Sequence, residues 1–329
     1  MHKRKLGKSG FFVSEIGFGT WGIGGFVAGA SYGATEDRQS RAALVQARDC
    51  GIDFFDTADA YGDGHAETLL GEVFGASGSV RIATKAGHPR FGGPQDFSPS
   101  HLRRSVEGSL RRLQRTTIDL LQLHNPPLEL LHAEPEILAT LEALKCEGKI
   151  AAWGLSLKTP AEALAAIAAF APVCVQANFN LADQRALETG LLDRALAADV
   201  GVIARTPLAF GFLSGKLGAD AVFPEGDHRR NWPPERIRQW ADAGRNLAGD
   251  IAANAGHTLA QIALRFCLSH PAISVAIPGM LAPAEVRENA AASDFGPLDP
   301  ADVARIRAAY AGSAFAGPAA PTPKTPPRN

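Results

Sequence analysis

The sequence IDFFDTADAYG, residues 52–62, combines a short apolar strand with a cluster of ionisable side chains. The residues before Asp56 can pack in a core, and Asp56 stands where such a strand should end. Tyr61 follows within a tight loop. A carboxylate at the end of a strand and a phenol one loop away form a candidate proton-transfer pair, provided that a third group stabilises the phenolate.

Apolar, strand-like runs alternate with helical stretches on both sides of this segment. Eight strands are predicted, at residues 16–18, 52–56, 80–84, 118–123, 150–155, 173–176, 200–204 and 273–277. Residues 159–162 and 258–261 read as capping boxes, and one helix is predicted over residues 185–198. Eight strands that alternate with helices favour an α/β fold, a closed (β/α)8 TIM barrel, over an open sheet.

The ends of the chain add to this barrel. Residues 5–13 predict a β-hairpin that could plug the barrel before its first strand, and additional C-terminal helices are expected after residue 234. No internal domain boundary is visible, so residues 1–315 are expected to form a single domain. The Pro-rich residues 316–329 predict a flexible tail.

Composition excludes several classes of function. The chain has 33 Lys+Arg and 34 Asp+Glu, so no net charge favours nucleic acid or an acidic membrane surface. No apolar run approaches the ~20 residues that a membrane-spanning helix needs. The four cysteines are widely spaced without a CxxC pair, which favours a reducing, cytoplasmic compartment. We therefore expect a soluble protein with a small-molecule ligand.

Polar residues stand at the carboxyl ends of most predicted strands, the face where barrels carry their catalytic groups. Each one alone has an ordinary structural explanation, such as a helix cap, a surface lysine or a structural histidine. Because all of them are expected at the same face of the barrel, an active site is favoured instead. The strand-end residues, in chain order, are Gly19, Thr20, Trp21, Asp56, Lys85, His124, Ser156, Gln176, Asn178, Arg205, Pro278 and Gly279, and most of these strand ends carry a side chain that can hydrogen-bond or ionise.

The chemistry of this set suits protonation of an alkoxide. Asp56 and Lys85 on neighbouring strands can form an ion pair, and the ammonium near Tyr61 would stabilise a phenolate. His124 can donate a hydrogen bond to a carbonyl oxygen. No Gly-x-Ser-x-Gly elbow, zinc-ligand spacing or pair of strand-end carboxylates typical of glycosidases is present, so we expect no metal. A hydride donor must come from outside, because no side chain supplies one.

These residues lie in segments that resemble the aldo-keto reductase family over essentially the full chain. The segments are DTADAYG, ATKAG, IDLLQLHNP, VQANFN, PLAFGFLSGK and IPG, and they are similar to the bacterial aldose dehydrogenase and potassium-channel beta-subunit-like branches. The resemblance implies a nicotinamide cofactor and reversible reduction of aldehydes or ketones, or oxidation of sugars and alcohols. It also implies that Tyr61 is the general acid, that Lys85 and Asp56 assist it, and that His124 orients the carbonyl.

The resemblance further implies a set of cofactor contacts. Ser156 and Gln176 match positions that hold the nicotinamide carboxamide, although Leu157 replaces the usual Asn, and Arg205 stands where an aromatic ring usually stacks on the nicotinamide. The other cofactor residues implied are Gly19, Thr20, Trp21 and Asp56, then Leu208, Gly211, Leu213, Gly215 and Lys216 of a loop over the pyrophosphate, and finally Pro278, Gly279, Glu285 and Asn289 near the adenosine.

Two questions stay open at this level. Members that prefer NADPH often carry a Lys and an Arg where Gly279 and Glu285 stand here, so NADP(H) is favoured only narrowly and NAD(H) is possible. The departures at Leu157, Arg205 and Glu285 also leave room for a barrel that senses cofactor or regulates a partner with negligible turnover. Substrate contacts are expected from the loops at residues 21–33, 88–97 and 223–232, with Trp21, His88 and Trp232 as candidate walls.

Overall fold

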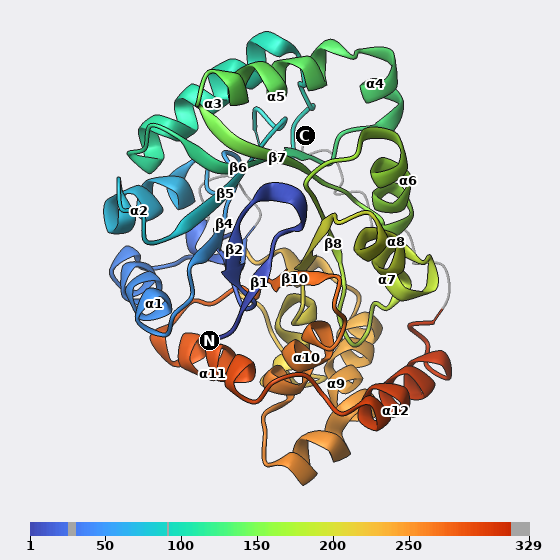
Figure 1. The fold of residues 1–329 in the computed structure, drawn as a ribbon. Helices are drawn as coiled ribbons and strands as arrows, with labels where there is room; N and C mark the ends of the chain where they lie inside the picture. Colours follow the sequence, from blue (N-terminus) through green and yellow to red (C-terminus); the bar gives the residue numbers. More distant parts are fainter. Residues whose placement is uncertain (26–30, 91, 317–329) are drawn as a thin grey trace.

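The computed structural model describes residues 1–25, 31–90 and 92–316. Eight parallel strands form one sheet in which each strand pairs with its neighbours in the sequence. The strands, drawn as arrows in Figure 1, are β3 (Phe18–Gly19), β4 (Phe54–Asp56), β5 (Arg81–Ala86), β6 (Ile118–His124), β7 (Ile150–Ser156), β8 (Cys174–Asn178), β9 (Gly201–Arg205) and β10 (Ile273–Ala276).

The two edges of this sheet meet. Parallel bridges join Ile16 to Ala276 and Gly19 to Gly279, and the Gly17 amide donates to the Ala276 carbonyl over 2.8 Å. At Gly19 a Cβ would lie 2.9 Å from the Ile277 carbonyl oxygen, so the close approach of the edges requires glycine. The sheet therefore closes, and the predicted (β/α)8 TIM barrel is confirmed.

Helices surround the barrel, and their starts follow the predicted signals. The Thr159 and Thr258 side chains each accept from the backbone amide three residues later, and Glu162 and Gln261 complete the two capping boxes. The helices are α1 (Asp37–Asp49), α2 (His65–Phe74), α3 (Pro99–Leu113), α4 (Leu128–Ala133), α5 (Glu136–Cys146), α6 (Pro160–Phe170), α7 (Arg185–Glu188), α8 (Leu191–Ala197), α9 (Pro234–Ala255), α10 (Leu259–Leu268), α11 (Pro283–Asp294) and α12 (Pro300–Ala311).

The prediction of one helix over residues 185–198 was wrong, because this segment holds both α7 and α8. Gly190 separates them with a φ of 74°, a left-handed conformation that an α-helix cannot continue through. The short helix α4 was not predicted either. Among the described residues, no helix combines the length and apolar character needed to cross a membrane.

The predicted N-terminal plug is present. Strands β1 (Lys3–Lys5) and β2 (Phe12–Ser14) pair antiparallel and lie across the barrel end that faces the viewer in Figure 1. Gly7 in the connecting turn has a φ of 48°, and a Cβ there would lie 2.3 Å from the Gly201 amide nitrogen. Only glycine fits so close to the barrel wall, so the hairpin seals that end.

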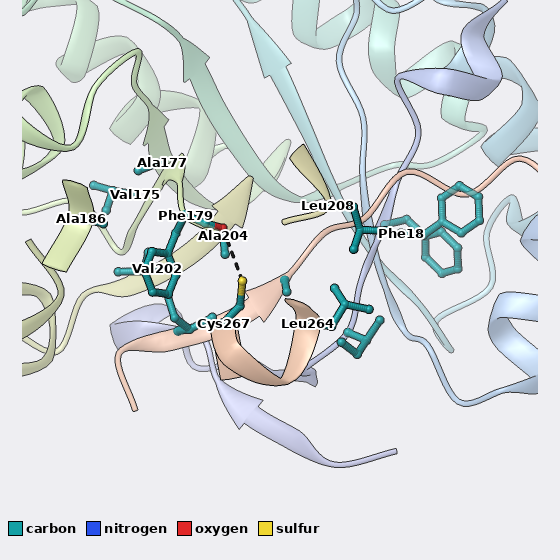
Figure 2. Packing of buried hydrophobic residues seen from close by; sticks show 14 of the residues in the cluster. Phe18, Val175, Ala177, Phe179, Ala186, Val202, Ala204, Leu208, Leu264 and Cys267 are labelled. Carbon is teal, nitrogen blue, oxygen red and sulfur yellow. Dashed lines mark hydrogen bonds between the residues drawn. The ribbon is translucent and has the colours of Figure 1, made fainter. Parts of the chain in front are cut away.

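Alternation along the strands divides the core into two layers. Val175, Ala177, Val202 and Ala204 point outward and pack against the surrounding helices (Figure 2). The intervening residues of the same strands point inward, where the lower ones join a second apolar cluster with the plug residues Leu6 and Val13. The last inward residues, at the carboxyl ends of the strands, are polar and form the floor of the site described below. The predicted tail, residues 316–329, lies outside the described residues from residue 317 onward.

Candidate active site

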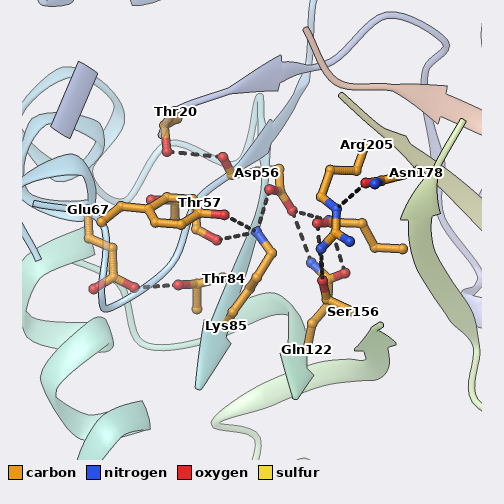
Figure 3. Close-up of polar contacts among 12 residues, drawn as sticks. Thr20, Asp56, Thr57, Glu67, Thr84, Lys85, Gln122, Ser156, Asn178 and Arg205 are labelled. Atoms are coloured by element: carbon orange, nitrogen blue, oxygen red, sulfur yellow. Dashed lines mark hydrogen bonds and ion pairs between the residues drawn. The ribbon is translucent and has the colours of Figure 1, made fainter. Parts of the chain in front are cut away.

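Lys85 and Asp56 form a buried ion pair at the carboxyl ends of β5 and β4. The Lys85 Nζ donates to Asp56 Oδ1 over 2.5 Å, to the Thr57 carbonyl over 2.9 Å and to Tyr61 Oη over 3.3 Å (Figure 3). The Lys85 side chain is fully buried. Burial acts to lower the pKa of Lys85, but the charges of Asp56 and Tyr61 outweigh it and raise that pKa above its usual value. Lys85 is therefore a permanent ammonium within hydrogen-bonding distance of a phenol.

The second carboxylate oxygen of Asp56 is held by two amides. Gln122 Nε2 donates to Asp56 Oδ2 over 3.0 Å and Gln176 Nε2 donates over 2.7 Å. Gln122 was not predicted, although it stands two residues before His124 on β6, so strand alternation puts both on the inner face. The hydrogen bonds of the Asp56 carboxylate thus go to Lys85, Gln122 and Gln176, and its link to Tyr61 runs through Lys85.

Tyr61 lies on the loop between β4 and α2, and its geometry depends on the following glycine. Gly62 has a φ of 60°, and a Cβ there would lie 2.1 Å from the Gly24 carbonyl oxygen. His124 ends β6, with its ring centroid 6.0 Å from that of Tyr61 and the planes at 85°. Burial, together with the charges of Lys85, His88 and Arg205, holds the pKa of His124 well below its usual value. The imidazole is therefore neutral and can donate from one ring nitrogen.

A second polar network supports the Tyr61 loop from outside the barrel. Buried Glu67 on α2 accepts from Thr84 over 2.5 Å and pairs with Arg112 over 2.7 Å, which ties α2 to β5 and α3 (Figure 3). Asp59 accepts from the Ser105 hydroxyl over 2.5 Å, while its Oδ1 has no partner among the described residues. Burial raises the pKa of Asp59 to about 7, and the hydrogen bond from Ser105 opposes this shift only in part.

Arg205 spans three strand ends at the opposite side of the floor. Its Nε donates to Asn178 Oδ1 over 2.9 Å, its Nη1 to Ser156 Oγ over 3.2 Å and its Nη2 to the Leu157 carbonyl over 2.8 Å. Ser156 in turn donates to Gln176 Oε1 over 3.3 Å. Ser156, Gln176 and Arg205, which are all predicted cofactor residues, therefore form one connected group that also reaches Asp56.

A cavity of about 1240 Å³ opens above this floor. It is larger than the ~300–1,000 Å³ of typical small-molecule pockets, and a dinucleotide together with a substrate would need such space. Tyr61 and His124 line it, as do seven of the predicted cofactor residues: Gly19, Thr20, Trp21, Asp56, Gln176, Arg205 and Gly279. Residues without a predicted cofactor or catalytic role, including Tyr32, Asn125, Lys158 and Phe210, complete the walls.

Comparison with known proteins identifies the family. The model of the aldo/keto reductase family matches residues 15–311. The chain belongs to the aldo/keto reductase family. It is 31% identical to the aldo-keto reductase YhdN of Bacillus subtilis over 298 residues, which cover 87% of each chain. It is 30% identical to a probable voltage-gated potassium channel subunit beta of Arabidopsis thaliana, over 91% of this chain and 93% of that one.

Solved structures agree with this assignment. The glycerol dehydrogenase AKR11B4 from Gluconobacter oxydans superposes with a TM-score of 0.79 at 26% identity, covering 97% of this chain and 98% of that one. The holo form of the aldo-keto reductase AKR11C1 from Bacillus halodurans gives a TM-score of 0.74 at 26% identity, covering 94% and 96%. The chain is thus an NAD(P)H-dependent oxidoreductase of the aldo/keto reductase family, whose substrates are small-molecule carbonyl compounds.

Some residues that the aldo/keto reductase resemblance assigns to the cofactor do not line the cavity. Leu208, Gly211, Leu213, Gly215 and Lys216 belong to the segment around the 3₁₀ helix η3 (Ala209–Ser214), from which Phe210 lines the cavity. Gly211 and Gly215 have φ values of 92° and 75°, so the backbone there requires glycine. Lys216 Nζ lies 2.7 Å from Glu288 Oε2 on α11, so its charge is already paired.

The adenosine end predicted for an aldo/keto reductase lies at the start of α11. Glu285 Oε2 accepts from the Leu281 amide over 2.7 Å, which caps the turn after Pro278 and Gly279. Arg287 on the same helix donates to Gln46 Oε1 on α1 over 2.9 Å, so it points away from Glu285. Asn289 is buried on the same helix. None of these residues except Gly279 lines the cavity, and their cofactor contacts stay a prediction.

Proposed function

We propose that this aldo/keto reductase transfers a hydride reversibly between its nicotinamide cofactor and a carbonyl or alcohol substrate, with Tyr61 as the general acid. The observation that carries the proposal is the position of Lys85, whose Nζ contacts both Asp56 Oδ1 and Tyr61 Oη. The bound cofactor would supply or accept the hydride. The protein side chains would place the Tyr61 proton and the substrate oxygen atom.

Three side chains divide this work. When the Tyr61 proton moves to the substrate oxygen, the phenolate left behind is stabilised by the Lys85 ammonium 3.3 Å away. Asp56 balances the charge of Lys85 and fixes its direction. His124, neutral and beside Tyr61, would donate to the same substrate oxygen and orient the carbonyl. In the oxidation of an alcohol or sugar the same groups would act in reverse order.

We propose cofactor contacts for the residues that the resemblance implies. Ser156 and Gln176 would face the nicotinamide carboxamide. The guanidinium of Arg205, which bonds to Asn178, Ser156 and the Leu157 carbonyl, would stack on the ring. Segment 208–216 would cover the pyrophosphate, and Asn289 would contact the adenine. NADP(H) is favoured over NAD(H) because the family resemblance implies it. The preference is narrow, because Glu285 would repel a 2′-phosphate at this end.

The composition of the chain supports proposals about its cellular compartment and its binding partners. A nearly balanced charge and four cysteines without a paired motif support a cytoplasmic protein that binds no nucleic acid or membrane. Residues 1–315 would act as one catalytic domain. The catalytic groups proposed above all come from one chain, so a monomer suffices for the chemistry.

The test is a steady-state assay of aldehydes, ketones and free sugars with NADPH and with NADH. Substrate-dependent oxidation of the reduced cofactor that requires Tyr61 would support the proposal. Turnover by a Tyr61→Phe variant at close to the wild-type rate, with normal folding, would show that another group is the acid. The absence of turnover with every substrate class and both cofactors would overturn the enzymatic function.

A second candidate function is the sensing of cofactor or the regulation of a partner with negligible turnover. The 30% sequence identity to a probable potassium channel subunit beta favours this function. Leu157, Arg205 and Glu285, which differ from the residues usual in the family, favour it as well. The complete group of Asp56, Lys85, Tyr61 and His124 favours the enzyme. Single-turnover measurements separate them, since a sensor would show one burst limited by very slow exchange of the cofactor, and an enzyme would continue at a steady rate.

A further inference from the structure

The turn that carries Tyr61 continues the barrel sheet past the end of β4. The amides of Thr57 and Asp59 donate to two alternate carbonyls of β5, over 2.8 and 3.4 Å. Successive side chains of such an extended segment point to opposite faces of the sheet, so those of Thr57 and Asp59 share one face. Asp56 points into the barrel toward Lys85 (Figure 3). The side chains of Thr57 and Asp59 therefore point outward, toward the surrounding helices.

Asp59 is bound to α3 on this outer face. Its Oδ2 accepts a hydrogen bond from the hydroxyl of buried Ser105 over 2.5 Å. Asp59 stands two residues before Tyr61, and the Tyr61 amide donates to the Ala58 carbonyl over 3.1 Å, which closes a tight turn over residues 58–61. The turn is therefore held by β5 on its inner side and by Ser105 on its outer side.

The position of this turn decides how closely Tyr61 approaches Lys85. The Lys85 side chain is fully buried and paired with Asp56 over 2.5 Å, so its ammonium has a fixed position. It donates to Tyr61 Oη over 3.3 Å, a distance near the long limit of a hydrogen bond from nitrogen. A small shift of the turn away from β5 would break this contact. Small misplacements of a reacting group lower the rate by large factors.

We propose that Asp59 and Ser105 are positioning residues for the general acid, because their hydrogen bond holds the turn of residues 58–61 where Tyr61 reaches Lys85. Neither Asp59 nor Ser105 lines the cavity, so both act through Tyr61 and not on the substrate or the cofactor. The proposal rests on the role of Tyr61 proposed above and adds to it the group outside the barrel that places this side chain.

The hydrogen bond from Ser105 does not depend on the charge of Asp59. Burial raises the pKa of Asp59 to about 7, against the opposing effect of Ser105, while Glu67 raises it and Arg112 lowers it to a smaller extent. Both forms of the carboxyl group therefore occur near neutral pH. An ionised carboxylate accepts with either oxygen, and a neutral carboxyl group keeps one carbonyl oxygen as an acceptor. Asparagine, which also carries an acceptor oxygen, should thus replace Asp59 in this role.

The first test separates kcat from the KM of the cofactor, with whichever of propanal, benzaldehyde and glyceraldehyde the wild type reduces fastest. Ser105→Ala removes the donor and Asp59→Ala removes the acceptor. We expect each variant to lower kcat by about three- to thirtyfold, with the KM of the cofactor changed by less than about twofold. Asp59→Asn keeps the acceptor and should retain kcat within about twofold of the wild type.

The matched control is Ser109→Ala, which makes the same change one turn further along α3. Ser109 is also buried, but it accepts from Arg112 over 3.5 Å and has no hydrogen bond to the turn of residues 58–61. Its kcat should stay within about twofold of the wild type. A loss as large as that of Ser105→Ala would indicate a general effect on α3 and would overturn the positioning role.

The second test does not need turnover. The chain has three tyrosines, so tyrosine labelled with carbon-13 at Cζ gives three NMR signals, and Tyr61→Phe identifies the signal of Tyr61. We expect Ser105→Ala to shift or broaden this signal and to leave that of Tyr310, on α12, in place. Asp59→Asn should leave both signals close to their wild-type positions.

The outcomes are distinct. An unchanged kcat and an unchanged Tyr61 signal in Ser105→Ala would overturn the positioning role while wild-type turnover upholds the carbonyl reduction. Equal losses of kcat in Asp59→Asn and Asp59→Ala would overturn it as well, because the charge of Asp59 would then matter and not its hydrogen bond. If the wild type reduces none of the aldehydes, the proposed function fails, and the Tyr61 signal alone decides whether Ser105 places this residue. Should Ser105→Ala not fold, the two Asp59 variants decide.

Discussion

Lys85 donates to Asp56 over 2.5 Å while neither side chain has more than 3% of its surface exposed. A buried pair of this kind contributes little to stability as a unit, but removal of one partner leaves an uncompensated charge. We expect Lys85→Met to lower kcat by at least about 100-fold, because the developing phenolate loses its neighbouring charge. The free energy of unfolding should fall by about 3–5 kcal/mol, as measured by denaturant titration.

The matched control is Lys145→Met, which removes a lysine from the surface of α5. It should change neither property, since exposed ion pairs contribute about 0–1 kcal/mol. A Lys85→Met variant with nearly normal turnover would contradict the arrangement in which Lys85 assists Tyr61.

Tyr61→Phe removes only the phenolic oxygen. We expect kcat to fall by about 100-fold or more, as is typical for the loss of a general acid. The dissociation constant for the cofactor, measured by fluorescence titration, should change little, because no cofactor contact is assigned to this hydroxyl. Tyr310→Phe makes the same change on α12, where the hydroxyl bonds the Phe315 carbonyl, and should leave kcat intact. Comparable losses in both variants would indicate a folding effect instead.

The lowered pKa of His124 predicts the shape of a pH profile. A histidine whose pKa lies well below 6.5 stays neutral as the pH falls through that value. The kcat/KM for reduction should therefore show no inflection near pH 6.5. His124→Gln, which keeps a donor, should lower kcat/KM without adding or removing an inflection there. An inflection near pH 6.5 that disappears in His124→Gln would show that the residue titrates in the ordinary range.

Asp59 should make the fold less stable as the pH rises. Its pKa is raised from 3.8 to about 7, so between these values the unfolded chain has released a proton that the native state retains. Stability from this group is therefore present below about pH 4 and is lost as the pH rises toward 7. Partial exposure of the side chain reduces the effect, and we expect it to be on the order of 2 kcal/mol at pH 8.

Asp59→Asn removes this titration. The variant should match the wild type in urea titrations at pH 4 and exceed it at pH 8. The control is Asp242→Asn, on the exposed face of α9, whose difference in stability from the wild type should be the same at both pH values. A destabilisation of Asp59→Asn that is equal at both pH values would mean that the carboxylate is ionised throughout.

Glu285 should influence the choice of cofactor. If it faces the ribose 2′ position, Glu285→Gln should lower the KM for NADPH by about three- to tenfold and change the KM for NADH much less. Glutamine keeps an oxygen that can accept from the Leu281 amide, so the turn should persist. Glu129→Gln, on the surface of α4, provides the control. Equal changes for both cofactors, or a strong wild-type preference for NADPH, would contradict the assignment.

The sequence was informative wherever position along a strand decides geometry. Asp56 and His124 end their strands and Lys85 is the second-last residue of β5. Parallel neighbours bring strand ends to one edge, so the proximity of these residues could be predicted without coordinates. Capping boxes were equally readable, because all of their contacts lie within four residues.

Contacts that depend on lateral register or on loop paths could not be predicted in this way. Gln122 reaches Asp56 because β5 and β6 pair Lys85 with Gln122, a register that the pattern alone does not specify. Gln95 reaches His88 and His124 from an irregular loop. Lys216 finds Glu288 across 72 residues of sequence, and its pairing departs from the free charge expected for a phosphate contact.

The plug ties the first residues of the chain to the last strand of the barrel. Arg4 donates to the Leu268 and Ile273 carbonyls, and Gly17 and Gly19 bond to Ala276 and Pro278. On the ribosome these partners are made some 250 residues later, which at about 5–20 residues per second is on the order of 10–50 s. These contacts with the last strand must therefore form after most of the chain has been synthesised. The barrel can therefore close only after β10, near the carboxyl end of the chain, has left the ribosome.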